Sequence, residues 1–512
     1  MSPLIQGLLR PEAYDHPVAG FEVLETHISW VILTGEFAYK LKKPVDFGFV
    51  NFTTLERRKW FCEEELRLNR RLAADLYLDV APVCVRGGLP EFGGAGTPID
   101  YAVKMRQFDQ AALLPQVLSR GELRPDQLDQ FADVMAEFQA RAAVAGDDQE
   151  FGAPDAVRLP MTANLEALAR HPDFAAEVAH LREWSDREFA RLEPVFRERK
   201  RLGRVRECHG DLHLGNLVLQ HDRIAAFDCL EFNAGLRWID VVSEIAFLVM
   251  DLAERGQPGL ANRVLNRWLE QTGDFAGLST WVWYFVYRSL VRAKVAWLRS
   301  LQTDQSTAAR ATQQAEVSQY LRLALRWTQP RRTAVIITHG VSGSGKSFLA
   351  QEICQRLGAV RVRSDVERKR QFGLWGIPRV SRRSGDPYSR DVSQALYESV
   401  LPDLAEAIVL NGFPVIVDAA FLRSDDRRRF RDLAERLQVP WLILDVTVEP
   451  DVARQRILQR QLAGGDPSDA DASILERQLR SQEPLTGSEQ LFAVSGSDPD
   501  AVWQELRRRL DP

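Results

Sequence analysis

The stretch with the most chemical content is residues 338–347, which read THGVSGSGKS after the apolar run 334–337. Its glycines fit G-x-x-x-x-G-K-S/T, in which a glycine turn joins a buried strand to a helix. Backbone N–H groups can turn inward at glycines, and the helix N-terminus adds positive potential, so such a loop cradles phosphates. We therefore predict a nucleoside triphosphate site made by Gly340, Ser342, Gly343, Ser344, Gly345, Lys346 and Ser347. In it Lys346 reaches the β- and γ-phosphates, and the Ser347 hydroxyl binds Mg²⁺.

A second stretch, residues 209–216, reads HGDLHLGN and precedes an apolar strand that ends in Phe227-Asp228. A phosphoryl transferase needs a carboxylate to take the proton of the attacking hydroxyl, and hard oxygen ligands to hold Mg²⁺. Asp211 is the candidate general base of this region. Asn216 and Asp228 are its candidate metal ligands.

Two more carboxylates follow predicted strands of the C-terminal half. Asp365 comes directly after the strand 360–363, where an acceptor hydroxyl would lie beside the phosphate loop, and could act as its general base. Alternatively, Asp365 caps the helix that begins VERKR. Asp418 ends the apolar strand 414–418, a position that supports Mg²⁺ in such enzymes. A strand-terminal turn or a helix cap is the alternative for Asp418.

Three arginines lie in the predicted helix 450–462, just before Gly464-Gly465-Asp466-Pro467. The three are Arg454, Arg456 and Arg460. Arg456 and Arg460 are four residues apart and therefore share a helix face. A mobile lid carrying Arg456 and Arg460 would bring positive charge to the transferring phosphoryl group. A solvated arginine face is the competing interpretation.

The first half alternates between strand and helix patterns before it becomes mainly helical. Residues 23–50 alternate apolar and polar side chains around the turn Thr34-Gly35-Glu36, which predicts an antiparallel hairpin. An amphipathic helix over 54–73 places Glu65 on its inward face. Two further strands are predicted at 76–86 and 100–108, and helices at 125–145, 161–200 (with interruptions) and 238–327.

The second half alternates strands and helices, which predicts a parallel sheet wrapped by helices. Residues 329–332 form a plausible linker, so we expect two domains, 1–328 and 333–512. The predicted strands are 334–338, 360–363, 414–418 and 440–446, and the predicted helices are 346–357, 389–411, 424–437 and 450–462.

Composition limits the classes of protein to consider. The 512 residues, 45% hydrophobic, can form two or three domains with proper cores, and the net charge of −5 offers no general case for nucleic-acid binding. The five cysteines form no C-x-x-C pair, so neither a zinc site nor a disulfide framework is indicated. We find no signal peptide and no apolar run long enough to span a bilayer, and therefore expect a soluble cytoplasmic protein.

Residues 20–325 resemble the aminoglycoside phosphotransferase and choline kinase-like family, on the motif H-G-D-x-x-x-x-N and the following Asp228. The resemblance implies a protein-kinase-like fold with a small β lobe and a helical lobe. It also implies a phosphate-binding lysine on an early strand, paired with a helix glutamate: Lys40 and Glu65 match, with Lys42 as the other candidate. Asp240 matches the family's loop-steadying aspartate, and His209 would buttress the loop by hydrogen bonding. No G-x-G-x-x-G loop is present, so residues 29–35 would have to cover the phosphates.

Residues 333–505 resemble the small P-loop kinases, namely gluconate kinase, zeta toxin and the polynucleotide kinase 5′-domains, on the phosphate loop and Asp365. Both resemblances imply that MgATP phosphorylates a hydroxyl of a small polar molecule, without a membrane or nucleic-acid partner. A nucleotide-sensing regulator with one pseudokinase half is an alternative. Nucleic-acid end phosphorylation is another, because several basic residues flank the acceptor side: Arg361, Arg363, Arg368, Lys369, Arg370, Arg382 and Arg383. The acceptor and the oligomeric state stay open.

Overall fold

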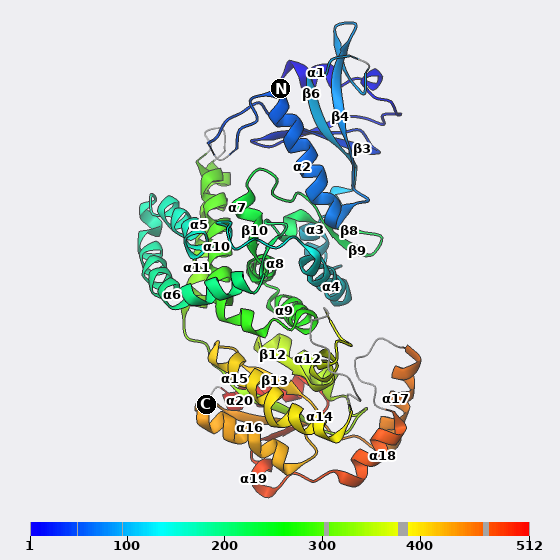
Figure 1. The fold of residues 1–512 in the computed structure, drawn as a ribbon, viewed down its shortest axis with the longest axis vertical. Helices are drawn as coiled ribbons and strands as arrows, with labels where there is room; N and C mark the ends of the chain where they lie inside the picture. The colour runs from blue at the N-terminus through cyan, green and yellow to red at the C-terminus, as the bar shows by residue number, and fades with distance from the viewer. Residues whose placement is uncertain are drawn as a thin grey trace. The chain divides into compact units, whose positions relative to one another are not determined.

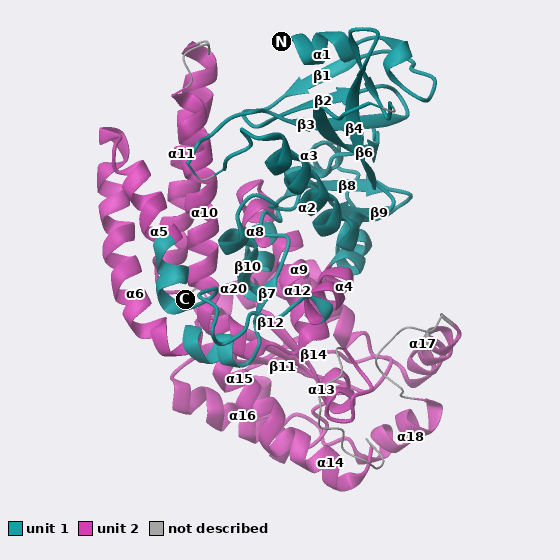
Figure 2. Cartoon of the chain, turned by 45° about the horizontal axis from the view of Figure 1, so that its top comes forward, with its two compact units in different colours: residues 1–131, 141–159, 196–248 teal, residues 132–140, 160–195, 249–512 magenta. Residues whose placement is uncertain are grey.

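The computed structural model describes residues 2–48, 50–94, 96–301, 307–376, 388–463 and 471–510, except the side chains of Arg460 and Ala463. The chain divides into two compact units (Figure 2). Unit 1 comprises residues 1–131, 141–159 and 196–248, and unit 2 comprises residues 132–140, 160–195 and 249–512. Helices of the first half thus belong to the same unit as the phosphate loop, and a domain boundary at 328–333 stays a prediction.

Unit 1 begins with a six-stranded antiparallel sheet in the order β1-β2-β3-β6-β4-β5 (Figure 1). Helix α2 (Leu55–Ala73) packs against this sheet and starts at the N-cap Thr54, whose hydroxyl accepts the backbone N–H of Arg57. Apolar residues of β2 and β3, such as Ile32 and Leu41, are fully buried because alternate side chains face the core. The strands are β1 (Glu22–Glu25), β2 (Ser29–Leu33), β3 (Phe37–Lys42), β4 (Tyr77–Arg86), β5 (Leu89–Phe92) and β6 (Asp100–Arg106).

Two short strand pairs in unit 1 hold the segment that carries the H-G-D motif. Strand β7 (Val205–Glu207) pairs with β10 (Trp238–Asp240), and β8 (Leu217–Gln220) pairs with β9 (Arg223–Ala226). The motif therefore lies between β7 and β8, and Asp228 follows β9. These pairings bring residues 209–216 and Asp228 to one place although they are separated in the sequence.

The helical part of the first half is built from long helices. Helices α10 and α11 pack against each other, and α10 buries Trp281 and Trp283 completely. Within the described residues, no helix combines the length and the apolar character needed to cross a bilayer. The helices are α4 (Pro125–Arg141), α5 (Pro154–Leu168), α6 (Ala175–Arg201), α8 (Val241–Glu254), α9 (Pro258–Thr272), α10 (Leu278–Ser300) and α11 (Thr307–Thr328).

The phosphate-loop part of unit 2 is a five-stranded parallel sheet in the order β12-β13-β11-β14-β15. Its central strands are buried and read as continuous apolar runs, as expected where helices cover both faces. The strands are β11 (Val335–His339), β12 (Val360–Arg363), β13 (Val415–Asp418), β14 (Trp441–Asp445) and β15 (Ala493–Ser495). The helices include α12 (Lys346–Leu357), α13 (Ser364–Gln371), α15 (Leu401–Leu410), α16 (Ser424–Leu437), α17 (Pro450–Ala463), α18 (Ala472–Ser481) and α20 (Pro499–Leu510).

The predicted fold class is confirmed: a kinase-like part with a small antiparallel sheet and helices precedes a P-loop part with a parallel sheet. Strands β5 and β15 are short and were not predicted, whereas helix α13 is the helix beginning VERKR that was considered for capping by Asp365. The predicted helix 389–411 contains a π-helical turn at Leu396–Val400 between α14 (Arg390–Ala395) and α15.

Candidate active sites

Strand β3 presents two lysines to Glu65 of helix α2. The Nζ atom of Lys40 lies 2.8 Å from Glu65 Oε1 and 2.5 Å from Asp228 Oδ1. The Nζ atom of Lys42 lies 2.7 Å from Glu65 Oε2 and also contacts Glu231. Lys42 is fully buried, whereas Lys40 lines a cavity. The geometry thus favours Lys40 as the phosphate-facing lysine and gives Lys42 the task of holding Glu65.

The charges of this cluster balance one another in the protein interior. Burial alone would raise the pKa of Glu65, but Lys40 and Lys42 outweigh it and lower the pKa to about 2. Burial is the larger effect at Glu231, and raises its pKa. Burial also opposes the charge on Lys40, yet Asp228 and Glu65 raise its pKa well above the ordinary value. Glu65 and Lys40 are therefore both charged at neutral pH.

The H-G-D motif forms a tight loop around Asp211. The Asn216 amide donates to the backbone oxygen and to Oδ2 of Asp211, both at 2.9 Å. The backbone N–H of Asp211 donates to His209 Nδ1 (3.3 Å), so His209 Nε2 carries the proton and donates to the Phe227 carbonyl at 2.9 Å. Burial lowers the pKa of His209, which keeps the ring neutral. His209 thus has the geometry of the expected buttress.

A carboxylate that the sequence analysis did not identify supports the start of this loop. Glu244 accepts the backbone N–H groups of His209 and Gly210, each at 3.0 Å. Asp240, the expected loop-steadying residue, instead binds Arg199 at 2.5 and 2.7 Å and caps its own helix at Val242. Asp240 ends strand β10, and among the described residues its side chain contacts Arg199 of α6 and the Val242 N–H, not the loop.

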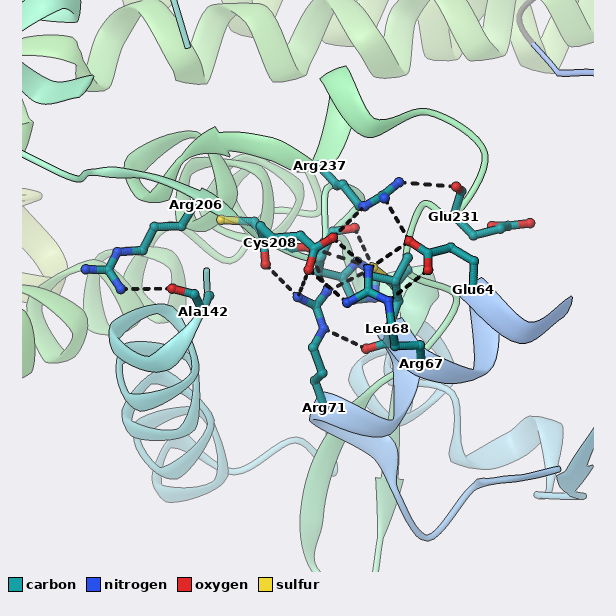
Figure 3. A network of polar contacts seen from close by, with 12 residues as sticks. Glu64, Arg67, Leu68, Arg71, Ala142, Arg206, Cys208, Glu231 and Arg237 are labelled. Carbon is teal, nitrogen blue, oxygen red and sulfur yellow. Dashed lines mark hydrogen bonds and ion pairs between the residues drawn. The ribbon is translucent and has the colours of Figure 1, made fainter. Parts of the chain in front are cut away.

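An ion-pair network fastens helix α2 to the strand that enters the loop (Figure 3). Glu207, at the end of β7, accepts from Arg67 at 2.7 Å and from Arg71 and Arg237, each at 3.2 Å. Arg237 also binds Glu64 of α2 at 2.8 Å. Because Glu65 is the next residue along α2, this network sets the distance between Glu65 and the loop. The residues of α2 lie more than a hundred positions from Glu207 and Arg237 in the sequence, so no local sequence pattern indicates these pairs.

The first site encloses a cavity of about 510 Å³ whose lining includes Lys40, Asp211, Asn216 and Asp228. Strands β1 and β2 and the turn between them cover it, from Leu24 to Leu33. Three residues of the expected cover, Ser29, Val31 and Leu33, line this cavity, and the Gly35 N–H of the following turn donates to Gln107 at 2.8 Å.

The predicted phosphate loop depends on its glycines for space. Gly340, Gly343 and Gly345 all have positive φ angles, of 144°, 80° and 100°. A Cβ atom on Gly340 would lie 2.4 Å from the Val446 carbonyl oxygen, and one on Gly343 would lie 2.6 Å from the Ala453 carbonyl oxygen. Any larger residue would therefore displace the loop.

Ser347 and Asp418 form a hydroxyl–carboxylate pair at the start of α12. The Ser347 hydroxyl donates to Asp418 Oδ1 at 3.1 Å, and Asp418 is 4% exposed. Among the described residues, Asp418 Oδ2 is buried without a hydrogen-bond partner, although Arg363 Nε lies 3.8 Å away. A buried carboxylate oxygen with spare acceptor capacity beside a hydroxyl suits a hard cation, so this pair fits Mg²⁺. Asp418 is not a helix cap, since the next helix, α16, begins only at Ser424.

Asp365 lies in the first turn of α13 and lines the same cavity, of about 310 Å³, as Lys346 and Asp418. Strand β13 separates β12 from β11, so Asp365 and Lys346 come from near-adjacent strands. The N-cap position of α13 is Arg363, and within the described chain no side chain caps this helix. The capping alternative for Asp365 therefore finds no support in the geometry.

The predicted arginines divide into different environments. Arg456 donates to the Ser344 carbonyl at 2.9 Å and lines the cavity, whereas Arg454 binds Glu476 at 2.6 Å. The side chain of Arg460 lies outside the described residues. Sequence reasoning missed Gln478, whose Oε1 accepts the Ser342 N–H at 2.7 Å, and Arg477 beside it. Their helix α18 follows the lid region, and nothing in its sequence alone indicates that it turns toward the loop.

Comparisons with known proteins match two separate stretches of the chain. The family described as "Phosphotransferase enzyme family" matches residues 61–281, and the one described as "AAA domain" matches residues 335–485. An uncharacterized protein of Mycobacterium tuberculosis is 31% identical over 472 residues, which cover 90% of each chain. Two solved structures are similar to parts of the chain. A gluconokinase from Sinorhizobium meliloti (21% identity, TM-score 0.26) covers 35% of this chain and 93% of its own. A choline/ethanolamine kinase family protein from Mesorhizobium loti (12% identity, TM-score 0.36) covers 62% and 97%.

Proposed function

The chain belongs to the family of the mycobacterial relative, and on this premise we propose that each of its two parts uses MgATP to phosphorylate a hydroxyl of a small polar molecule. The two family matches make the chain a kinase-type phosphotransferase with nucleotide-binding parts. The choice of ATP, the metal and the class of acceptor are the proposed elements.

The observation that carries the proposal is that one cavity in the P-loop part is lined by Lys346, Ser347, Asp365 and Asp418. Lys346 and Arg456 would hold the phosphates, and Ser347 with Asp418 would hold Mg²⁺, which neutralises charge on the phosphates. Asp365 would accept the proton of the acceptor hydroxyl. The acceptor oxygen then forms its bond to the γ-phosphorus. At the same time the bond from that phosphorus to the β,γ-bridging oxygen breaks, and the nucleoside diphosphate leaves.

The first site offers the same set of roles from different elements. Lys40, fixed by Glu65, would hold phosphate oxygens, and Asn216 and Asp228 would hold Mg²⁺. Asp211 would accept the acceptor's proton, with Asn216 fixing its carboxylate. Lys40 and Asp228 contact each other directly, so a metal bound by Asp228 would free the Lys40 charge for the phosphates.

Cavity size supports a small acceptor in both parts. The cavities, of about 310 and 510 Å³, lie within the size range of small-molecule sites. The arginines Arg361 and Arg370, considered above for nucleic-acid contacts, are instead bonded to helix α9. We therefore favour a small polar metabolite over a nucleic-acid end.

Labelled ATP incubated with a metabolite pool, followed by mass spectrometry, tests the proposal. The full-length chain is compared with Lys346→Ala and with Asp228→Asn. We expect labelled phosphate esters from the wild-type chain, and loss of a different subset in each variant. A wild-type chain that binds ATP but labels no metabolite in any pool would contradict the proposal.

A further inference from the structure

Helix α9 belongs to the predicted first domain, residues 1–328, but covers the edge of the parallel sheet. Strand β12 is an edge strand, and its outer side needs hydrogen-bond partners. Asn262 and Asn266 of α9 both donate to the Ala359 carbonyl at 2.9 Å, and Asn266 accepts the Arg361 N–H at 2.7 Å. Both elements belong to unit 2, where α9 lies beside β12 and α12 (Figure 2).

One turn further along the same face, α9 places Glu270 against the arginines of β12. The Glu270 carboxylate lies 3.3 Å from Arg361 and 3.4 Å from Arg363, and 3.0 Å from Arg267 of its own helix. Its side chain is only 7% exposed. Burial alone would raise the pKa of Glu270, but Arg363, Arg361 and Arg267 outweigh it and lower the pKa, so the group is anionic.

Arg361 and Arg363 connect Glu270 to the candidate Mg²⁺ position at Ser347 and Asp418 through their hydrogen bonds and ion pairs. Arg361 donates through Nη2 to Glu270 and through Nη1 to the Ser347 carbonyl at 3.2 Å. Arg363 Nε lies 3.8 Å from Asp418 Oδ2, and Asp418 accepts the Ser347 hydroxyl. Arg363 is thus shared between two carboxylates, one from each half of the sequence.

The end of α9 also holds the helix that carries Asp365. Arg370 of α13 donates to the Glu270 carbonyl at 2.6 Å and to the Gln271 carbonyl at 3.2 Å. These are the free carbonyl groups at a helix C-terminus, where a cation is favoured. A Cβ atom on Gly376 would lie 2.2 Å from the Gln271 oxygen, so the chain after α13 also passes close to α9.

From these contacts we infer that Glu270 is a positioning residue for the P-loop site: it holds Arg363 away from Asp418 and so keeps the Asp418 carboxylate available to Mg²⁺. The inference rests on the proposed function of that site. It makes phosphoryl transfer at the P-loop site depend on helix α9, which precedes the predicted linker 329–332 in the sequence. Without the Glu270 charge, Arg363 would pair with Asp418 and compete with the metal.

The test measures binding of a non-hydrolysable ATP analogue by calorimetry over a range of Mg²⁺ concentrations. All variants are full-length and carry Asp228→Asn, which removes Mg²⁺-dependent binding at the first site. Glu270→Gln is expected to raise the Mg²⁺ concentration at half-maximal effect about tenfold, as is typical when a partner of a metal ligand is lost. Binding in EDTA should not weaken, because the change removes a negative charge. If Glu270→Gln only disturbed packing, binding of the analogue would weaken both in Mg²⁺ and in EDTA.

Two further variants keep the outcome decisive. Glu270→Asp retains the charge but retracts it, and should shift the Mg²⁺ midpoint about threefold at an unchanged melting temperature. It decides the question if Glu270→Gln fails to fold. Glu489→Gln breaks another buried pair of the same unit, with Arg427 at 2.7 Å, and should lower the melting temperature without moving the Mg²⁺ midpoint.

The failure of the inference is distinguishable from the failure of the proposed function. If Lys346→Ala in the same background leaves analogue binding intact, the second site is not the nucleotide site and the proposed function fails. If Lys346→Ala abolishes binding but both Glu270 variants keep the wild-type Mg²⁺ midpoint, Glu270 is not a positioning residue.

Discussion

The two candidate sites differ in the balance of charged side chains that line their cavities. The cavity of the first site is lined by two cationic side chains, Lys40 and Arg106, and three carboxylates, Asp211, Asp228 and Glu231. The cavity of the P-loop site is lined by five cationic side chains and two carboxylates: Lys346, Arg363, Arg368, Arg456 and Arg477, with Asp365 and Asp418. A nucleotide is itself anionic, so the first site needs a metal to accept it, whereas the second attracts it directly.

The sites also differ in what they are made of. The P-loop site uses the backbone of one short segment, held in place by glycines that no other residue could replace. The first site uses side chains that come from positions between 40 and 228, and its geometry depends on ion pairs such as Lys40–Glu65. We therefore expect the first site to respond to charge changes in its supporting residues, and the second to respond mainly to changes in the loop and its carboxylates.

The largest expected effect concerns Asp365. Asp365→Asn should lower the rate of phosphoryl transfer by the P-loop site about 10²- to 10⁴-fold, as the loss of a general base does. Nucleotide affinity and melting temperature should stay unchanged, because Asp365 caps no helix in the described chain. Single-turnover rates in an Asp228→Asn background measure the effect. A variant that melts earlier but keeps its rate would make Asp365 structural.

A charge change in the first site should act on stability. Glu65→Gln leaves the buried Lys40 and Lys42 short of a partner and should cost about 3–5 kcal/mol in the free energy of unfolding. Glu63→Gln on the same helix removes only an exposed pair with Lys59 and should cost about 0.5 kcal/mol or less. Urea unfolding at pH 7 measures both. Equal costs would show that the Glu65 pairs add nothing.

The comparison of wild type with Glu65→Gln gives a pH dependence of known sign. The pKa of Glu65 is lowered from its ordinary value of 4.5 to about 2 in the folded chain. The unfolded state therefore binds more protons between these values, and the stability from the Glu65 charge, complete above pH 4.5, is lost as the pH falls toward 2. The difference between wild type and Glu65→Gln should shrink from pH 5 to pH 3. A constant difference would contradict a shifted carboxylate.

A smaller effect separates two arginines of helix α17. Arg456→Ala should weaken nucleotide binding at the P-loop site about 10- to 150-fold, the size expected for one charge-assisted contact of about 1.5–3 kcal/mol. Arg454→Ala should leave that affinity unchanged, because Arg454 binds Glu476 and Asp451. Calorimetry on both variants in the Asp228→Asn background decides. Equal losses of nucleotide affinity in the two variants would instead support a solvated arginine face without a specific role for Arg456.

The two sites also differ in how much of each can be predicted from the sequence, because one is a contiguous segment and the other is assembled from distant residues. The phosphate loop is contiguous, so its strand, glycines, Lys346 and helix could be predicted from local pattern alone. At the first site the sequence paired Lys40 with Glu65 only through a family resemblance, and kept Lys42 as the fallback. What settles the choice is burial, since Lys42 is enclosed and Lys40 faces the cavity.

The supporting residues could not be predicted. Glu244, Glu207 and Glu270 each act on partners in other elements, and a buried glutamate in a helical pattern looks like any other. Their roles arise from desolvation, because a buried carboxylate must be paired, and only the fold shows with what. Glu207 pairs with arginines of α2 that lie 136 and 140 residues away.

The contrast between the sites is tested most directly by counting nucleotide sites with and without metal. Calorimetry of the full-length chain with a non-hydrolysable ATP analogue should give two sites in Mg²⁺ and one in EDTA. The site that persists in EDTA should disappear in Lys346→Ala, and the Mg²⁺-dependent site should disappear in Asp228→Asn. Two sites in EDTA, or a persisting site that survives Lys346→Ala, would contradict the account.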